Sequence, residues 1–122
     1  MQSKSSGPTL PSPEVPYPSL LGQVLKQVRQ ARNVQQTDLA AALGLSQSAY
    51  SRLESGDSVL NAWQLRQCAL ELGTTPSVLL AEVERMELQL TQSGVSIVAE
   101  KKSNPAAAML GIAFLVALLS KM

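Results

Sequence analysis

The stretch QTDLAAALGLSQSAYSRLESG, from Gln36 to Gly56, decides the fold. Its apolar residues have the spacing of two short helices that cross steeply and share a core. Gly44 stands at the turn between them, where a positive φ would be unfavourable for a residue with a β-carbon. Ser46 follows, with a hydroxyl that can accept from the free amides of the next helix. The pattern predicts a helix-turn-helix, and the apolar positions are Leu39, Leu43, Leu45, Tyr50 and Leu53.

Helical spacing continues on both sides of this stretch. One helix is predicted from a cap at Ser19 to about Asn33. A fourth begins at the cap Asn61 and ends at Gly73, with a fifth opened by Thr75 and Pro76. The apolar members of the fourth are Trp63, Leu65, Ala69, Leu70 and Leu72. We therefore expect an all-α, five-helix domain over residues 19–90, with an extended last helix.

The last of these helices carries a short heptad pattern, in which Leu79, Val83, Met86 and Leu90 are spaced by four, three and four residues. Such a seam could pair with a second copy of the chain, or it could pack onto its own domain. Both alternatives remain open at this point.

The ends of the chain differ in composition from the domain. Residues 1–18 hold five of the seven prolines, with Ser and Gly between them, and are predicted to be a disordered leader rather than a signal peptide. Residues 91–104 are expected to be a linker, in which 94–98 is a weak strand candidate. Residues 105–122 are predicted to form an apolar C-terminal helix.

The C-terminal segment has no charged residue between Ala106 and Leu119, and only Gly111 interrupts its apolar side chains. A helix over 105–120 would be about 24 Å long, against a hydrocarbon core of about 30 Å. Flanking lysines could close the gap, and their placement would keep the domain in the cytoplasm, at the inner membrane. These lysines are Lys101, Lys102 and Lys121. We expect a membrane anchor; the alternative is a tail buried in an oligomer interface.

The composition argues against catalysis. The chain has no histidine and a single cysteine, Cys68, which is expected in the core. No nucleophile with a base, carboxylate pair or metal-ligand cluster is visible. We expect no enzyme, with no catalytic residue, metal or cofactor.

Two stretches, LGQVLKQVRQARNVQQTDLAAALGLSQSAYSRLESG and LRQCALELGTTPSVLL, carry a resemblance to a known family. Over about residues 21–80 the sequence resembles the phage-repressor and Cro type of helix-turn-helix proteins, also called the xenobiotic-response-element (XRE) family. The resemblance implies a five-helix bundle that binds DNA through the helix at 46–55.

The same resemblance implies roles for single residues. Gln36 matches a phosphate contact, and Gln47 and Ser48 match side chains that reach base edges. Arg52 matches a base or phosphate contact, and Ser51 of the same helix joins the candidates. Arg29 and Glu54 match a structural ion pair. Gln suits adenine and Arg suits guanine in the major groove. Tyr50 departs from the usual aliphatic residue, and we expect a buried ring with its hydroxyl at the rim.

A second departure concerns charge. The family often carries Lys or Arg after the glycine at 56, whereas this chain has Asp57. Residues 19–90 contain six basic and seven acidic side chains, so a monomer should bind DNA weakly. The favoured partner is double-stranded DNA, bound by a homodimer or higher oligomer acting as a bacterial or phage regulator or DNA organiser. The alternative is a protein-interaction module that docks a cytoplasmic partner, with the helix-turn-helix as scaffold.

Overall fold

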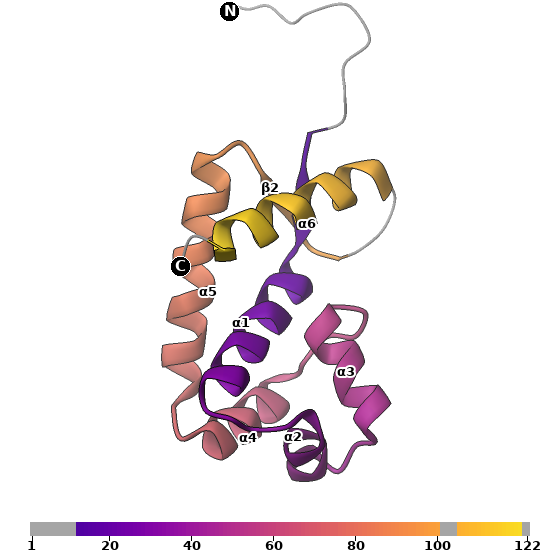
Figure 1. The fold of residues 1–122 in the computed structure, drawn as a ribbon, viewed down its shortest axis with the longest axis vertical. Helices are drawn as coiled ribbons and strands as arrows, with labels where there is room; N and C mark the ends of the chain where they lie inside the picture. Colours follow the sequence, from indigo (N-terminus) through magenta and orange to yellow (C-terminus); the bar gives the residue numbers. More distant parts are fainter. Residues whose placement is uncertain (1–11, 101–104, 121–122) are drawn as a thin grey trace, which may run out of the picture.

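The computed structural model describes residues 12–100 and 105–120, and the first five of its helices form the expected bundle. In Figure 1, α1 runs through the middle of the molecule, with α5 on one side and α3 on the other. The helices α2 and α4 lie together at one end. The bounds are α1 Tyr17–Ala31, α2 Gln36–Leu43, α3 Gln47–Ser55, α4 Ala62–Leu72 and α5 Pro76–Gln92.

The turn and caps predicted from the sequence are present. Gly44 ends α2 with φ of 70°, in the left-handed region that favours glycine. The Ser46 hydroxyl accepts from the amide of Ala49 at 3.1 Å. Asn61 and Thr75 cap α4 and α5 in the same manner. Local side-chain chemistry therefore sets where these helices begin and end.

The core lies between α1, α3, α4 and α5, and it settles the question of the heptad pattern. Leu79, Val83, Met86 and Leu90 are all at most 2% exposed and pack inside their own domain. The alternative in which this seam pairs with a second copy is therefore wrong. In α4, Leu65, Ala69, Cys68 and Leu72 are buried, whereas Trp63 and Leu70 are 63% and 58% exposed. These last two do not contribute to the core as the helical spacing suggested.

The start of the described chain corrects the expectation of a disordered leader up to residue 18. A strand, β1 (Glu14–Pro16), pairs in parallel with β2 (Ser96–Val98), with Val15 opposite Ile97. Val15 is completely buried, and α1 begins at Tyr17 rather than after Ser19. Burial of Val15 and strand pairing order this segment despite its prolines. Residues 1–11 of the expected leader lie outside the described residues.

The expected linker at 91–104 is also partly structured. The helix α5 continues to Gln92, and the weak strand candidate at 94–98 contains β2. Val95, which precedes β2, is buried in the core. Residues 101–104, with Lys101 and Lys102, lie outside the described residues.

The apolar C-terminal segment forms α6 (Pro105–Ser120), which packs across β1 and contacts α5 (Figure 1). Leu115 of α6 is 4% exposed and belongs to the same core. Among the described helices, none combines the length and apolarity needed to cross a bilayer. The expected membrane anchor thus gains no support, and one side of the helix packs on its own chain.

Candidate nucleic-acid interface

The helix α3 is held against α1 by a close backbone contact. Gly22 in α1 faces the backbone of Leu53 and Glu54, and a β-carbon at this position would collide with the Glu54 carbonyl. The hydroxyl of Ser19 donates to the carbonyl of Ser55 at 3.3 Å. Only glycine permits this approach, which fixes the end of α3 and leaves its first turns on the surface.

Arg29 and Glu54 form a buried ion pair that ties α1 to α3. The Arg29 Nε lies 2.6 Å from Glu54 Oε2, and Nη2 donates to Oε1 at 3.2 Å. A third donor, Nη1, reaches the carbonyl of Val34 at 3.0 Å. Arg29 and Glu54 are only 8% and 6% exposed. The bidentate geometry and the third hydrogen bond compensate for taking both charges out of water.

Glu54 accepts two more hydrogen bonds, one from its own helix α3 and one from α2. The Tyr50 hydroxyl donates to Oε2 at 2.8 Å, and Gln36 Nε2 donates to Oε1 at 2.9 Å. Burial alone would raise the pKa of the Glu54 carboxyl, but the hydrogen bonds from Arg29, Gln36 and Tyr50 hold this pKa below its usual value. Glu54 is therefore the charged centre on which α1, α2 and α3 converge.

The position of the Tyr50 hydroxyl corrects the expectation that it would lie at the rim. Tyr50 is completely buried, ring and hydroxyl together. Burial, followed by the charge of Glu54, raises the pKa of the phenol far above its ordinary value. The hydroxyl is thus a permanent donor to Glu54, which explains why an aromatic residue fits at this position.

A chain of amides leads from Glu54 to the surface. Gln47 Nε2 donates to Gln36 Oε1 at 3.0 Å, and Gln36 in turn donates to Glu54. An ionised carboxylate only accepts hydrogen bonds, so it fixes which end of the Gln36 amide faces inward. The Gln36 oxygen must then face Gln47, whose own NH₂ group must turn toward it. The carbonyl oxygen and the second N–H of Gln47 remain available to a ligand.

The candidate contacts lie on one exposed side of the molecule. Gln47, Ser48 and Arg52 of α3 are exposed, and Ser51 is half-buried. Ser48 shares a 3.3 Å hydrogen bond with the cap Ser46. No described residue holds the guanidinium of Arg52 by a hydrogen bond or ion pair. The structure therefore brings Gln47, Ser48 and Arg52 together on the surface of α3.

Gln36 is half-buried, and both ends of its side-chain amide are engaged. A polar hollow of about 270 Å³ opens beside it, lined by Arg29, Gln35, Gln36, Thr37 and Gln47. The phosphate contact that the resemblance implied for Gln36 stays a prediction. What the sequence did not reveal is that Gln36 positions Gln47. Two glutamines eleven residues apart give no local signal of this contact.

Charge is distributed unevenly around the site. The helix α5, with Glu82, Glu84 and Glu87, lies across α1 from α3 (Figure 1). Arg85, also on α5, pairs with Glu82 at 2.7 Å. Without α5, residues 19–75 hold five basic and four acidic side chains. The acidic excess counted from the sequence is thus removed from the surface that carries Gln47 and Arg52.

Two further polar contacts lie on α4 and in the loop after α3. The Arg66 guanidinium lies 5.2 Å from the centre of the exposed Trp63 ring, a cation–π contact on α4 that the sequence spacing did not identify. In the loop after α3, Asp57 accepts from the Ser55 hydroxyl at 2.9 Å.

Within residues 12–100 and 105–120 there is no cluster of His, Cys, Asp and Glu able to hold a metal ion.

Comparison with known proteins supports the assignment of this fold. A helix-turn-helix family profile matches residues 25–79. The structure of the clp gene regulator ClgR from C. glutamicum is 26% identical, with a TM-score of 0.54, over 57% of this chain and 90% of that one. An XRE-family like protein from Pseudomonas syringae pv. tomato is 34% identical, with a TM-score of 0.49, over 57% of this chain and 84% of that one. No curated protein matches the chain. The chain therefore belongs to the XRE family of helix-turn-helix proteins, and residues 25–79 are its family domain.

Proposed function

We propose that this protein is a DNA-binding transcriptional regulator that inserts α3 into the major groove. The observation that carries the proposal is the amide chain from Glu54 through Gln36 to Gln47. It presents one acceptor and one donor of Gln47 at the surface. This pair is complementary to the N6 amino group and N7 of adenine, which a glutamine can bind in bidentate fashion.

Arg52 supports the same function from the next turn of α3. Its guanidinium is exposed, and a free arginine there can bind a guanine edge or a phosphate. Ser48 and Ser51 supply short hydroxyl groups on the same helix. The similarity to the clp gene regulator ClgR favours a role in transcription.

The test is selection of DNA from a random duplex pool by the full chain, followed by sequencing of the bound fraction. We expect an enriched motif containing an adenine whose preference disappears in Gln47→Ala. The matched control is Gln92→Ala, which removes an exposed glutamine at the end of α5, away from α3. Loss of the adenine preference in both variants, or in neither, would contradict the assignment of Gln47.

One observation favours a second function. The loop after Gly56 carries Asp57 and no basic residue, so it lacks the phosphate contacts that favour DNA affinity. If the full chain enriches no sequence and binds random duplex no better than a neutral protein, the helix-turn-helix is instead a scaffold for a protein partner.

A further inference from the structure

The buried end of the amide chain holds Gln36 in one orientation. Oε2 of Glu54 accepts from Arg29 and Tyr50, and Oε1 of the same carboxylate accepts from Arg29 and Gln36. A carboxylate offers about four lone-pair positions, and these four hydrogen bonds fill them. Turning the Gln36 amide over would place its oxygen against this carboxylate, and two acceptors repel each other. The Gln36 oxygen is therefore held toward Gln47.

Gln47 is held in turn by Gln36. Its Nε2 donates to Gln36 Oε1 at 3.0 Å, so the carbonyl oxygen and one N–H remain for a ligand. Turning the Gln47 amide over would point its oxygen at the Gln36 oxygen and lose this hydrogen bond. Swinging the side chain away would also lose it, and would leave the oxygen of the half-buried Gln36 without a donor. The outward acceptor of Gln47 is therefore fixed in position.

A fixed acceptor distinguishes adenine from adenine methylated at N6. In a base pair, one hydrogen of the adenine N6 group bonds to thymine, and the other points into the major groove beside N7. The Gln47 oxygen is suited to accept this second hydrogen while its N–H donates to N7. In paired N6-methyladenine, a methyl group takes the place of that hydrogen. The oxygen then loses its donor and meets a methyl carbon instead.

The surroundings of Gln47 are polar and do not favour a methyl group. Next to it in the chain, the hydroxyls of Ser46 and Ser48 share a 3.3 Å hydrogen bond. Transfer of a methyl group out of water is favourable only against apolar surface. The described residues that line the hollow of about 270 Å³ beside Gln47 all have polar side chains: Arg29, Gln35, Gln36, Thr37 and Gln47 itself.

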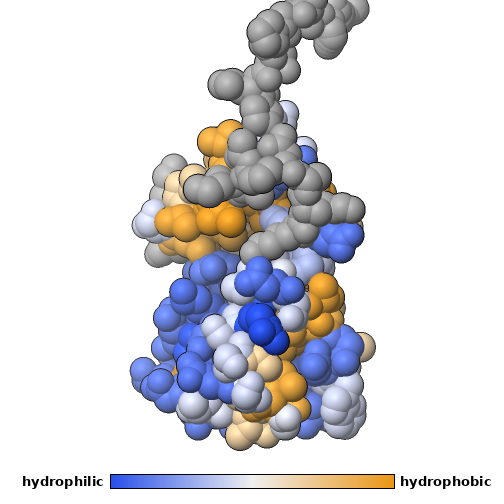
Figure 2. Space-filling view, turned by 90° about the vertical axis from the view of Figure 1, so that its right-hand side faces the viewer, coloured by the Kyte–Doolittle hydropathy of each residue, from blue (hydrophilic) through white to orange (hydrophobic). Residues whose placement is uncertain are grey.

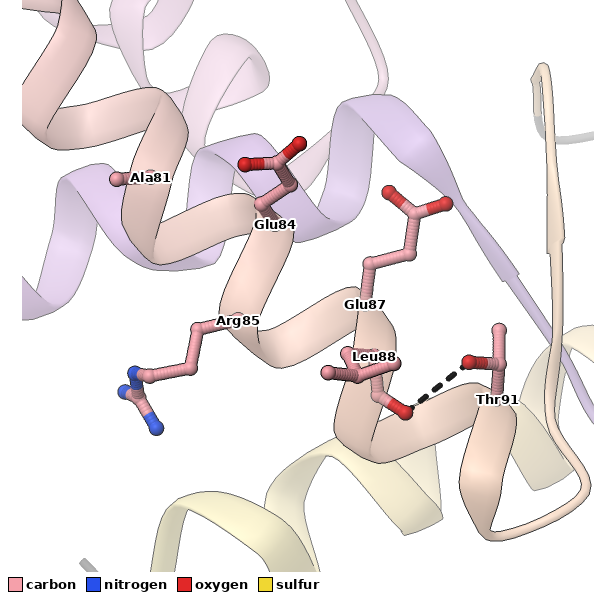
Figure 3. A pocket seen from close by; sticks show the side chains of 6 residues that line it. All are labelled: Ala81, Glu84, Arg85, Glu87, Leu88 and Thr91. Atoms are coloured by element: carbon pink, nitrogen blue, oxygen red, sulfur yellow. Dashed lines mark hydrogen bonds between the residues drawn. The ribbon is translucent and has the colours of Figure 1, made fainter.

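Two other features of the surface do not bring an apolar pocket to this contact. Figure 2 shows hydrophobic residues gathered at the level of α6, above a mostly polar surface. The helix α6 lies toward the opposite end of the molecule from α2, whose Gln36 holds Gln47 (Figure 1). A hollow of about 590 Å³ on α5 is lined by Glu84, Glu87 and Leu88, among others (Figure 3), and its carboxylates would repel DNA phosphates. Neither feature compensates for a methyl group at Gln47.

We propose that methylation of adenine at N6 releases this protein from its DNA site, because Gln47 rejects the methyl group. The inference rests on the proposed function, since it requires Gln47 to read an adenine. Gln36 is the positioning residue, because it prevents Gln47 from moving aside. The protein would thus respond to the methylation state of its site.

The methyl group itself is added by another enzyme, an adenine-specific DNA methyltransferase that uses a sulfonium methyl donor. The bond between N6 and the methyl carbon forms as the sulfur–carbon bond of the donor breaks. The displaced N6 hydrogen leaves as a proton. This protein reads the product and takes no part in the transfer.

The test uses the duplex site that the full chain selects, with the adenine read by Gln47 in three forms. It is unmodified, methylated at N6, or replaced by purine, which lacks the N6 amino group. Fluorescence anisotropy measures the Kd for each. Purine should weaken binding roughly fivefold, the effect of one lost hydrogen bond. Methylation should weaken it roughly 20-fold or more, because the collision adds to that loss. N6-methyladenine placed outside the selected site should have no effect.

Variants separate the effect of the methyl group on Gln47 from its effect on the duplex. Gln47→Ala should bind the methylated and unmodified sites equally. Gln36→Ala should bind the methylated site as well as the purine site, because Gln47 can then move aside. The matched control is Gln92→Ala, an exposed glutamine at the end of α5, which should keep the full effect of methylation. Thermal melting establishes that each variant is folded.

The outcomes distinguish this inference from the proposed function. Equal binding of the methylated and unmodified sites by the wild type would overturn the inference and leave the proposed function standing. An undiminished effect of methylation in Gln47→Ala would overturn it too, and in Gln36→Ala it would remove the positioning role of Gln36. A selected site without an adenine that depends on Gln47 would overturn the proposed role of Gln47 and, with it, this inference.

Discussion

The side-chain amide of Gln47 donates a 3.0 Å hydrogen bond to Oε1 of Gln36, which connects the surface of α3 to the buried carboxylate of Glu54. The contact matters because a free glutamine side chain rotates and can present either end of its amide. Here the buried carboxylate of Glu54, which only accepts hydrogen bonds, sets the orientation of the Gln47 amide through Gln36. The surface residue is thus ordered before any ligand arrives, which lowers the entropy lost on binding.

Gln47 and Arg52 should differ in what they contribute to DNA binding. Gln47→Ala and Arg52→Ala should each weaken binding to the selected site by about 1–3 kcal/mol, because each removes a base contact. On random duplex, Gln47→Ala should change affinity much less than Arg52→Ala, since only Arg52 carries charge. Fluorescence anisotropy on both DNAs measures this. Equal losses on both DNAs for Gln47→Ala would show that it does not read a base.

Gln36 should act on sequence preference through Gln47. Gln36→Ala removes the acceptor that orients Gln47, and also one of the hydrogen bonds to Glu54. We expect discrimination between adenine and the other bases at the Gln47 position to fall by about 1 kcal/mol, the contribution of one hydrogen bond. Binding to random duplex should be nearly unchanged. A uniform loss on all sequences would instead identify Gln36 as a phosphate contact.

Glu54 should make stability depend on pH. Its hydrogen bonds lower the pKa of the folded carboxyl, so the unfolded chain binds this proton more readily. The resulting stabilisation is complete above the unfolded pKa of about 4.3 and is lost as the pH falls through the lower folded value. Glu54→Gln should be less stable by about 3–5 kcal/mol at pH 7, because Arg29 stays buried without its partner. Between pH 5 and pH 3, the melting temperature of this variant should also fall less than that of the wild type, because the variant has no carboxyl at position 54 to take up a proton. Parallel curves for the two proteins would show that the hydrogen bonds to Glu54 do not lower its pKa in the folded state.

Asp57 should oppose DNA binding if its loop faces the phosphates. Asp57→Lys should raise affinity for any duplex and steepen its dependence on salt, since one more phosphate is neutralised. Asp57→Asn is the matched control, because it removes the negative charge without adding a positive one, and its effect should be smaller. If neither affinity nor salt slope changes in Asp57→Lys, this loop faces away from DNA.

Cys68 should report on opening of the core. The side chain is completely buried, and burial, followed by the charge of Glu54, raises the pKa of its thiol to about 12. A thiol reagent at pH 8 should therefore label the folded protein far more slowly than the protein in denaturant. Rapid labelling of the native chain would indicate that α4 separates from the core under native conditions.

The sequence alone was sufficient for the bundle of five helices and for the turn between α2 and α3. These features depend on helical spacing, on caps such as Ser46 and Asn61, and on Gly44, all of which act over a few residues. The resemblance to the XRE family also named Arg29 and Glu54 as partners, and the structure has them 2.6 Å apart. Their distance in the sequence, 25 residues, is bridged only because α1 and α3 pack closely at Gly22.

Only the tertiary structure decided what happens to the apolar surfaces. Spacing showed that α5 has an apolar seam and that α6 is apolar throughout, but not which neighbour covers them. Val15 pairs with Ile97, and Glu14 lies against Gly111, across most of the length of the chain. Such contacts depend on which surface the rest of the fold leaves uncovered, and no local pattern encodes this. For the same reason the sequence did not reveal the hydrogen bonds that link Glu54 to Gln47 through Gln36, because they form only once α2 and α3 bring these side chains together.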